Sequence, residues 1–195
     1  MKHLRNIPIC ANTLFVYKLD IEEDLILKFT KEKFKPTASP TLQSKDFNVL
    51  KKYKGLNKEI NKAIDLTLKE ILLLKNINYR IFRSWLTKVK PGGSSGSHTH
   101  SNSWLSGVYY PQGNPGFGIK FFYDNTAPFF TQPTAYNIYN SSEWVIVPED
   151  NFLILFFSQI RHEIMPNQSE KDRFSLSFNL FPKGEFGEND SKIIF

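Results

Sequence analysis

The sequence predicts a mainly β protein with N-terminal helices, and three observations lead to this fold class. The chain holds 18 Phe, 8 Tyr and 3 Trp, most of them after residue 79, and aromatic residues favour strands. Beyond that point short apolar segments alternate with turn-forming residues every 8–12 residues or so. Helical periodicity occurs only before residue 75. Together these patterns predict a jelly roll with helices on one face.

The first third of the chain, residues 1–75, is expected to supply a strand and helices that pack on the core. Residues 7–19 are typical of an opening or edge strand. The acidic run at 20–23 predicts the start of a helix that buries Leu25, Ile26 and Phe29 and ends before Pro36. Residues 36–48 have the composition of a loop.

A longer amphipathic helix is predicted from Leu56 to about Leu74, with Asn57 as its N-cap. Its apolar residues recur at helical spacing, which is typical of a helix that covers a sheet. These residues are Leu56, Ile60, Ala63, Ile64, Leu68, Ile71 and Leu72.

Residues 76–195 are expected to form the β core, in one compact domain with the preceding segment. The expected strands span residues 79–89, 105–110, 118–123, 136–139, 143–147, 151–157, 160–164 and 174–181. Residues 151–157 are almost continuously apolar, which predicts a strand buried on both faces. The last strand alternates apolar and polar residues, which predicts one apolar and one polar face.

Composition points to a cytoplasmic protein without a membrane segment. A single cysteine, Cys10, excludes an intramolecular disulfide and a cysteine-rich zinc site. No apolar run is long enough to cross a bilayer. The net charge is +6, but the lysines between residues 28 and 75 alternate with acidic residues and form no block, so nucleic-acid binding is only weakly supported.

Three of the four histidines are candidate metal ligands. His98 and His100 are two residues apart, so on extended chain both imidazoles point to the same side. His162 follows in another strand-like segment. Imidazole binds iron, copper, nickel and zinc, so the residue types alone do not choose the metal. Two histidines in a Gly/Ser loop can equally be surface residues. A second group of residues, which contains His162, Arg173 and Ser175, strengthens the hypothesis of a metal site.

That second group contains Arg173 and Ser175 on the last predicted strand. Their spacing puts a guanidinium and a hydroxyl on the same face, while Phe174 and Leu176 face the other side. An arginine fork with an adjacent hydroxyl is a good receptor for a carboxylate. The alternative is a surface arginine at the start of a strand.

These residues also carry a family resemblance. Ser158-x-x-x-His162, the Pro-Asn turn, and Arg-Phe-Ser-Leu-Ser-Phe-Asn from Arg173 to Asn179 resemble the end of the catalytic core of 2-oxoglutarate- and iron(II)-dependent oxygenases. The upstream segment His-Thr-His-Ser-Asn-Ser-Trp-Leu-Ser-Gly-Val-Tyr-Tyr resembles an oxygenase subfamily found in phages and marine bacteria, in which case the host cytoplasm is the location. The resemblance covers residues 79–181.

The resemblance implies a double-stranded β-helix with iron at one open end. His98 would be the first ligand and His162 the distal one, and Arg173 with Ser175 would bind the far carboxylate of 2-oxoglutarate. Further candidates for contact with 2-oxoglutarate are Tyr109, Tyr110 and Asn179. The implied reaction consumes O2, converts 2-oxoglutarate to succinate and hydroxylates a C–H bond of an unidentified substrate.

The second ligand departs from the family pattern of two histidines and one carboxylate. His100 occupies the position of the carboxylate. Either His100 replaces it, or a carboxylate such as Asp124 comes from elsewhere, or His100 is the first ligand and Asn102 the second. The shared face of residues i and i+2 favours His100 as a ligand beside His98.

Two other functions remain open at this point. One is a cupin-like three-histidine dioxygenase that needs no 2-oxoglutarate, against which the Arg173/Ser175 pair argues. The other is a non-catalytic jelly-roll binding or virion-associated module. The sequence names no substrate, although loops 91–97 and 124–134 are expected to shape the mouth of the site.

Overall fold

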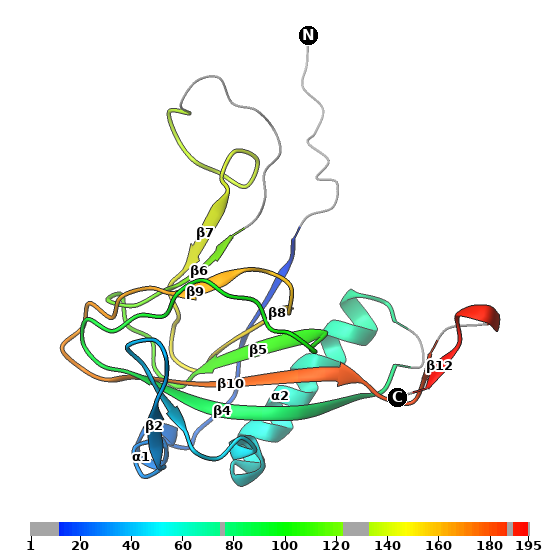
Figure 1. Cartoon of the computed structure of the whole chain (residues 1–195), viewed down its shortest axis with the longest axis horizontal. Helices are drawn as coiled ribbons and strands as arrows, with labels where there is room; N and C mark the ends of the chain where they lie inside the picture. The colour runs from blue at the N-terminus through cyan, green and yellow to red at the C-terminus, as the bar shows by residue number, and fades with distance from the viewer. Residues whose placement is uncertain (1–11, 75–76, 123–132, 187–188, 195) are drawn as a thin grey trace.

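A computed structural model describes residues 12–74, 77–122, 133–186 and 189–194, and it shows a layered, mainly antiparallel β protein (Figure 1). The larger sheet has seven strands in the spatial order β1-β8-β5-β10-β4-β3-β2. Their bounds are β1 Leu14–Lys18, β2 Phe34–Pro36, β3 Leu42–Ser44, β4 Tyr79–Val89, β5 Leu105–Tyr110, β8 Phe152–Phe157 and β10 Arg173–Pro182.

A smaller sheet of three strands lies over part of the larger one, in the order β7-β6-β9 (Figure 1). Its strands are β6 Ile119–Phe122, β7 Glu143–Ile146 and β9 His162–Ile164. Two short strands near the C-terminus, β11 Glu185–Phe186 and β12 Ile193–Ile194, pair with each other. The remaining short elements are the 3-10 turns η1 Val49–Lys52 and η3 Asn189–Ser191. The paired antiparallel sheets confirm the predicted jelly roll.

Two helices precede the β core, with bounds that differ from the prediction. The first, α1, spans only Leu25–Phe29, because the chain turns at Thr30 and enters β2; Leu25 and Phe29 are buried and Ile26 is partly exposed. Asp24 caps α1 by accepting hydrogen bonds from the amides of Ile26 and Leu27. The segment 36–48, predicted as a loop, contributes β3.

The second helix, α2, spans Lys54–Leu66 and continues as a π-helical turn, η2, over Thr67–Ile71. The prediction of Asn57 as its N-cap is wrong. The amide of Asn57 donates to the carbonyl of Tyr53, 2.8 Å away, so Asn57 already has an intrahelical partner. The helix begins at Lys54, two residues before Leu56, the first residue of its apolar pattern.

The predicted strand at Tyr136–Tyr139 is also wrong, because this segment forms a turn. Asn137 accepts a hydrogen bond from the amide of Tyr139 at 2.8 Å, and Asn140 accepts one from the amide of Asn137 at 2.7 Å. Asparagine side chains that bond nearby amides stabilise turns in competition with strands.

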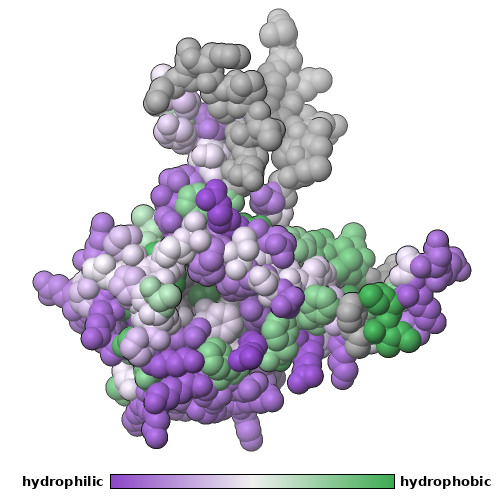
Figure 2. All heavy atoms as spheres, in the orientation of Figure 1, coloured by the Kyte–Doolittle hydropathy of each residue, from purple (hydrophilic) through white to green (hydrophobic). Residues whose placement is uncertain are grey.

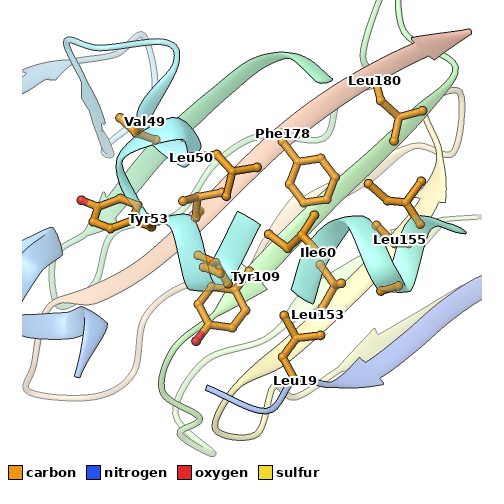
Figure 3. Packing of buried hydrophobic residues seen from close by; sticks show 14 of the residues in the cluster. Leu19, Val49, Leu50, Tyr53, Ile60, Tyr109, Leu153, Leu155, Phe178 and Leu180 are labelled. Carbon is orange, nitrogen blue, oxygen red and sulfur yellow. The ribbon is translucent and has the colours of Figure 1, made fainter. Parts of the chain in front are cut away.

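The larger sheet separates two apolar cores, so its central strands are buried on both faces. On one face, side chains of β5, β8 and β10 pack against α2, and Figure 3 shows Tyr109, Leu153, Leu155, Phe178 and Leu180 gathered on the side of the sheet where Ile60 of α2 lies. On the other face, a second core fills the space between the two sheets. It consists of Val108, Tyr110, Ile119, Phe121, Ile154, Phe156 and Ile160.

The N-terminal third therefore supplies both the helix layer and three strands, β1, β2 and β3, of the larger sheet. The expected boundary between residues 75 and 76 falls on residues outside the described ranges, and it stays a prediction. Within the described ranges, no helix is long and apolar enough to cross a membrane.

Gly107 in β5 is required by the core between the sheet and α2. It pairs with Phe178 of β10, and a Cβ at residue 107 would lie 2.2 Å from the Phe178 ring. We expect Gly107→Ala to lower the free energy of unfolding by about 1–3 kcal/mol, because the ring cannot move without disturbing the packing against α2. Urea unfolding would measure this loss. The control is Gly96→Ala, where an added Cβ meets nothing within 4 Å; an equal loss in both variants would contradict the packing argument.

Candidate metal centre and cosubstrate site

The segment that carries His98 and His100 lies antiparallel to residues 158–162 and is held there by backbone hydrogen bonds. The amide of His98 donates to the carbonyl of His162 at 2.9 Å, and the amide of His162 donates back at 3.0 Å. The amide of His100 donates to the carbonyl of Ser158 at 2.9 Å. Two segments that are far apart in the sequence are thus placed in a defined register beside the smaller sheet.

The three imidazoles converge in this arrangement. The rings of His98 and His100 stack with centroids 5.4 Å apart, as their spacing of two residues predicts. The His162 centroid lies 4.5 Å from that of His98 and 5.0 Å from that of His100. One potential ligand atom from each histidine lies within 4.8 Å of the others. Two nitrogens bound to one ion at about 2.1 Å lie at most about 4.2 Å apart, so small ring rotations would close the site around a metal.

The hydrogen bonds of two of these rings decide which nitrogen is available. Nδ1 of His98 lies 2.9 Å from the carbonyl oxygen of Gly96, and Nδ1 of His162 lies 2.9 Å from that of Ile160. A carbonyl oxygen only accepts, so each Nδ1 carries the proton and each Nε2 keeps its lone pair. This is the arrangement of a metal-binding histidine whose other nitrogen is held by an acceptor.

His100 is held by a buried polar network that the sequence did not reveal. Its Nδ1 lies 2.7 Å from Oδ1 of Asn179 and 2.7 Å from Oγ of Ser106. The Ser106 hydroxyl continues to Ser158 at 2.8 Å, and Ser158 donates to Ser103 at 2.8 Å. The network orients the third imidazole so that its Nε2 is the free nitrogen. Ser103 and Ser106 lie in the segment that carries the family resemblance, but only the three-dimensional arrangement shows that they belong to this network.

Burial keeps the two inner imidazoles neutral. It lowers the pKa of His162 to about 3, and it lowers the pKa of His100 below its usual value, with the neighbouring histidines acting in the same direction. A neutral imidazole is the form that binds a metal. Over the described part of the chain, the cluster contains no carboxylate. Asp124, the alternative ligand, lies outside the described residues, and Asn102 is exposed.

Arg173 lies between the sheets, only 1% exposed, and most of its hydrogen-bonding capacity is unused. Its guanidinium packs against the rings of Tyr110 and Phe117, with Cζ 5.7 and 5.3 Å from their centroids. Nη1 donates to the carbonyl of Gly118 at 3.3 Å, while Nε and Nη2 are buried with no partner among the described residues. Burial also lowers the pKa of Arg173. A buried cation with two unpaired donors is costly unless an anion binds there.

The other expected site residues lie on two different faces of the larger sheet. Tyr110, Ser175 and Asn179 face the space between the sheets and line one cavity of about 580 Å³. Asn179 contacts His100 there, which makes it a residue that positions the imidazole. The expectation for Tyr109 is wrong: its ring points toward α2, and its hydroxyl donates to Asn151 at 2.6 Å. Alternate strand residues face opposite sides, so Tyr109 and Tyr110 cannot share the site.

The cavity that holds the three histidines also has walls from the N-terminal third. The β2–β3 hairpin contributes Thr37, Thr41 and Gln43, which the sequence placed in an ordinary loop, and Ser95 and Ser97 come from the loop predicted to shape the mouth. The second predicted mouth loop falls largely on residues 123–132, outside the described ranges. The described lining is rich in Ser, Thr, Asn and Gln and contains no Asp, Glu, Lys or Arg.

Comparisons with known proteins agree with this geometry. A sequence model of the family described as "Putative 2OG-Fe(II) oxygenase" matches residues 83–179. That segment contains all three histidines, Arg173 and Asn179. No curated protein matches the chain. The assignment to a phage and marine-bacterial subfamily stays a prediction.

Solved structures share the fold at low sequence identity. A prolyl hydroxylase from Trichoplax adhaerens is 13% identical with a TM-score of 0.61, over 87% of this chain and 84% of that chain. HygX from Streptomyces hygroscopicus, solved with nickel, 2-oxoglutarate and hygromycin B, is 9% identical with a TM-score of 0.61, over 88% and 83%. The epimerase SnoN, solved with Fe3+ and alpha ketoglutarate, is 10% identical with a TM-score of 0.62, over 87% and 79%. With the jelly roll, the three-histidine cluster and the buried Arg173, the family match shows that residues 83–179 belong to the 2-oxoglutarate- and iron(II)-dependent oxygenases.

Proposed function

We propose that the chain hydroxylates a C–H bond with iron(II) held by His98, His100 and His162, and with 2-oxoglutarate as cosubstrate. The observation that carries the proposal is the pairing of two incomplete groups. Among the described residues, three imidazoles converge and no carboxylate joins them. The buried guanidinium of Arg173 has two unpaired donors and packs on Tyr110, which lines the cavity of the histidines. Iron complements the first group and a carboxylate complements the second.

The bound iron and 2-oxoglutarate would supply the oxidising chemistry, which uses O2 and releases succinate. The residues of the chain bind and orient these groups. The three Nε2 atoms hold the metal on one side, and Arg173 with the hydroxyl of Ser175 holds the far carboxylate of 2-oxoglutarate. Tyr110 packs on the guanidinium and helps to fix its direction. Phe121 and Phe156 pack against His162, with centroids 5.8 and 4.8 Å away, and exclude water from that side.

A three-histidine centre carries one more positive charge than a centre with a carboxylate ligand. The dianionic 2-oxoglutarate would neutralise the iron and so replace the missing carboxylate in the charge balance. This reasoning supports 2-oxoglutarate over the cupin-like alternative, in which Arg173 would have no anion to bind.

The defining experiment is succinate release from 2-oxoglutarate by the purified chain under O2, with and without iron(II). Release that requires iron supports the oxygenase. Metal binding with no effect of 2-oxoglutarate would favour the cupin-like dioxygenase, and no metal binding would favour the non-catalytic jelly-roll module. Incorporation of 18O from O2 into a product would separate hydroxylation from an epimerase-like outcome.

The identity of the second ligand has its own test. We expect His100→Ala to weaken iron binding by more than about 100-fold, because a direct ligand contributes more than an outer partner, whose loss typically costs about 10–100-fold. Asp124→Asn should leave iron affinity within about 3-fold of the wild type. Titration with iron(II) under anaerobic conditions measures both. A large loss of iron affinity in Asp124→Asn with little loss in His100→Ala would assign the second ligand to Asp124 and remove His100 from the centre.

A further inference from the structure

The face of the larger sheet that lines the cavity of the proposed metal centre continues past the cavity along β4 and β10. Asn179, which contacts His100, pairs with Arg83. Two residues further along, Phe181 pairs with Arg80, which is about 7 Å from the previous pair at the usual rise of a strand. In Figure 1 the end of β10 extends beyond the strands of the smaller sheet.

A β-bulge decides which side chains occupy this extension. The register shifts between Asn179 and Leu180, and Phe82 is the residue left without a partner on β4. Leu180 and its partner Ile81 face the α2 side, where they join that apolar core. Phe181 and Arg80 therefore face the side of the metal centre, because successive strand residues alternate.

Four exposed cations line this extension and its margin. Arg80 and Lys183 line a second cavity of about 460 Å³ together with Phe82, Asn102, Phe181 and Pro182. Arg83 and Lys35 lie over the ring of Phe47, with Cζ and Nζ 4.8 and 4.9 Å from its centroid. Lys35 shares the site face because it pairs with Gln43, which pairs in turn with Thr87 in the cavity.

These four residues, which we call the basic strip, lack acidic partners. Arg80, Arg83, Lys35 and Lys183 are all exposed, and none forms an ion pair within the described ranges. The lower edge of the molecule in Figure 2, where α1, β2 and the start of α2 lie in Figure 1, is mainly hydrophilic, and Lys35 belongs to β2. Uncompensated cations in a row attract a partner that carries several negative charges.

We propose that the basic strip binds single-stranded nucleic acid and leads one nucleotide into the cavity of the metal centre. The backbone phosphates would contact the four cations. Phe82, beside Arg80 and Lys183, would offer an apolar ring on which a base can stack, the combination typical of single-strand binding. The inference that nucleic acid is the substrate rests on the proposed oxygenase function. The inference that the basic strip binds nucleic acid does not.

The cavity supports nucleic acid over an acidic peptide. Its described lining is uncharged and offers Ser, Thr, Asn and Gln side chains, with the indole of Trp85 5.9 Å from the ring of His100. Such a lining fits an uncharged flat ring with hydrogen-bonding edges, which a nucleobase is and an acidic side chain is not. A duplex would keep its bases stacked and out of reach.

The test is binding of a fluorescein-labelled 12-nucleotide single-stranded DNA of mixed sequence, measured by anisotropy between 50 and 300 mM salt without iron or 2-oxoglutarate. We expect Arg80→Ala/Lys183→Ala to weaken binding by about 10-fold or more and to reduce the slope of log affinity against log salt by about 1.4. Phe82→Leu should weaken binding about 5-fold while the slope stays the same.

The matched control is Lys54→Ala/Lys58→Ala, which removes the same charge from exposed positions on α2. Equal losses in both double variants, or no loss in the strip variant, would overturn the proposal. So would a 12-residue poly-glutamate peptide or a duplex that binds as tightly as the single strand.

Succinate release without nucleic acid should be unchanged in Arg80→Ala/Lys183→Ala, because neither residue touches the metal centre or Arg173. Single-strand binding without any turnover would leave this inference standing and refute the oxygenase proposal. Turnover without single-strand binding would refute this inference and support the oxygenase proposal.

Discussion

His162→Ala is expected to abolish iron-dependent succinate release and to lower iron affinity by more than about 100-fold. His162 is the most buried of the three imidazoles, at 4% exposed, and this proposed ligand connects β9 to the His98 segment through a backbone bridge. Without its Nε2, the two remaining imidazoles stack on one side of the ion and leave the other side open. Anaerobic iron titration and succinate release measure the two effects.

Thermal stability gives this prediction a second readout. The wild type should gain about 2.7 kcal/mol from iron at 100 times its dissociation constant, and the variant should lose that gain. The metal-dependent shift is the useful quantity, because the variant also leaves the carbonyl of Ile160 without its donor and so loses some stability without metal. The control is His3→Ala, which removes the histidine that lies outside the described residues. An unchanged iron-dependent shift in His162→Ala would refute the three-histidine centre.

Arg173→Met is expected to weaken 2-oxoglutarate binding by at least about 100-fold without lowering the stability of the free protein. Each hydrogen bond from the guanidinium to a carboxylate contributes about 1.5–3 kcal/mol, and two donors are available. The free protein loses little, because a buried cation with unpaired donors gives way to an apolar side chain of similar volume. Calorimetric titration with 2-oxoglutarate and urea unfolding measure the two effects.

Arg173→Lys separates charge from geometry at the same position. It keeps the positive charge but loses the fork that binds a carboxylate with two parallel bonds, so its 2-oxoglutarate affinity should fall between those of the wild type and Arg173→Met. A large loss of stability in Arg173→Met together with unchanged 2-oxoglutarate affinity would show that Arg173 is structural.

The strand pattern at the end of the chain shows how far periodicity alone can lead. The alternation from Phe174 to Phe181 predicts a strand with one apolar and one polar face, and β10 has both. The first part of the polar face is shielded from solvent, however. It lies under the smaller sheet, where Arg173 and Ser175 are almost fully buried. Periodicity determines which residues share a face, whereas the layer above decides whether that face is surface or site.

The predictions that differ from the structure also depend on which layer covers each strand face. Tyr109 and Tyr110 are chemically equivalent in the sequence, and only the position of α2 against one face of β5 separates the core residue from the cavity residue. Ser106 and Ser158 stand within the segments that carry the family resemblance, but nothing in those segments indicates that their hydroxyls join one hydrogen-bonded network between strands that are distant in the sequence. At Tyr136–Tyr139 the chain forms a turn, because hydrogen bonds of asparagine side chains outweigh the strand propensity of the aromatic residues.

The sequence by itself determined the β class, the three histidines and the arginine, because residue chemistry and the period-two spacing depend only on local order. Tertiary structure decided the rest. The β-bulge at Phe82 turned Arg80 to the face of the metal centre, and the hairpin that contains Gln43 and Lys35 closed one side of the cavity. Both depend on pairings between distant segments, and the hydrogen bonds and burial that select those pairings exist only in the folded chain.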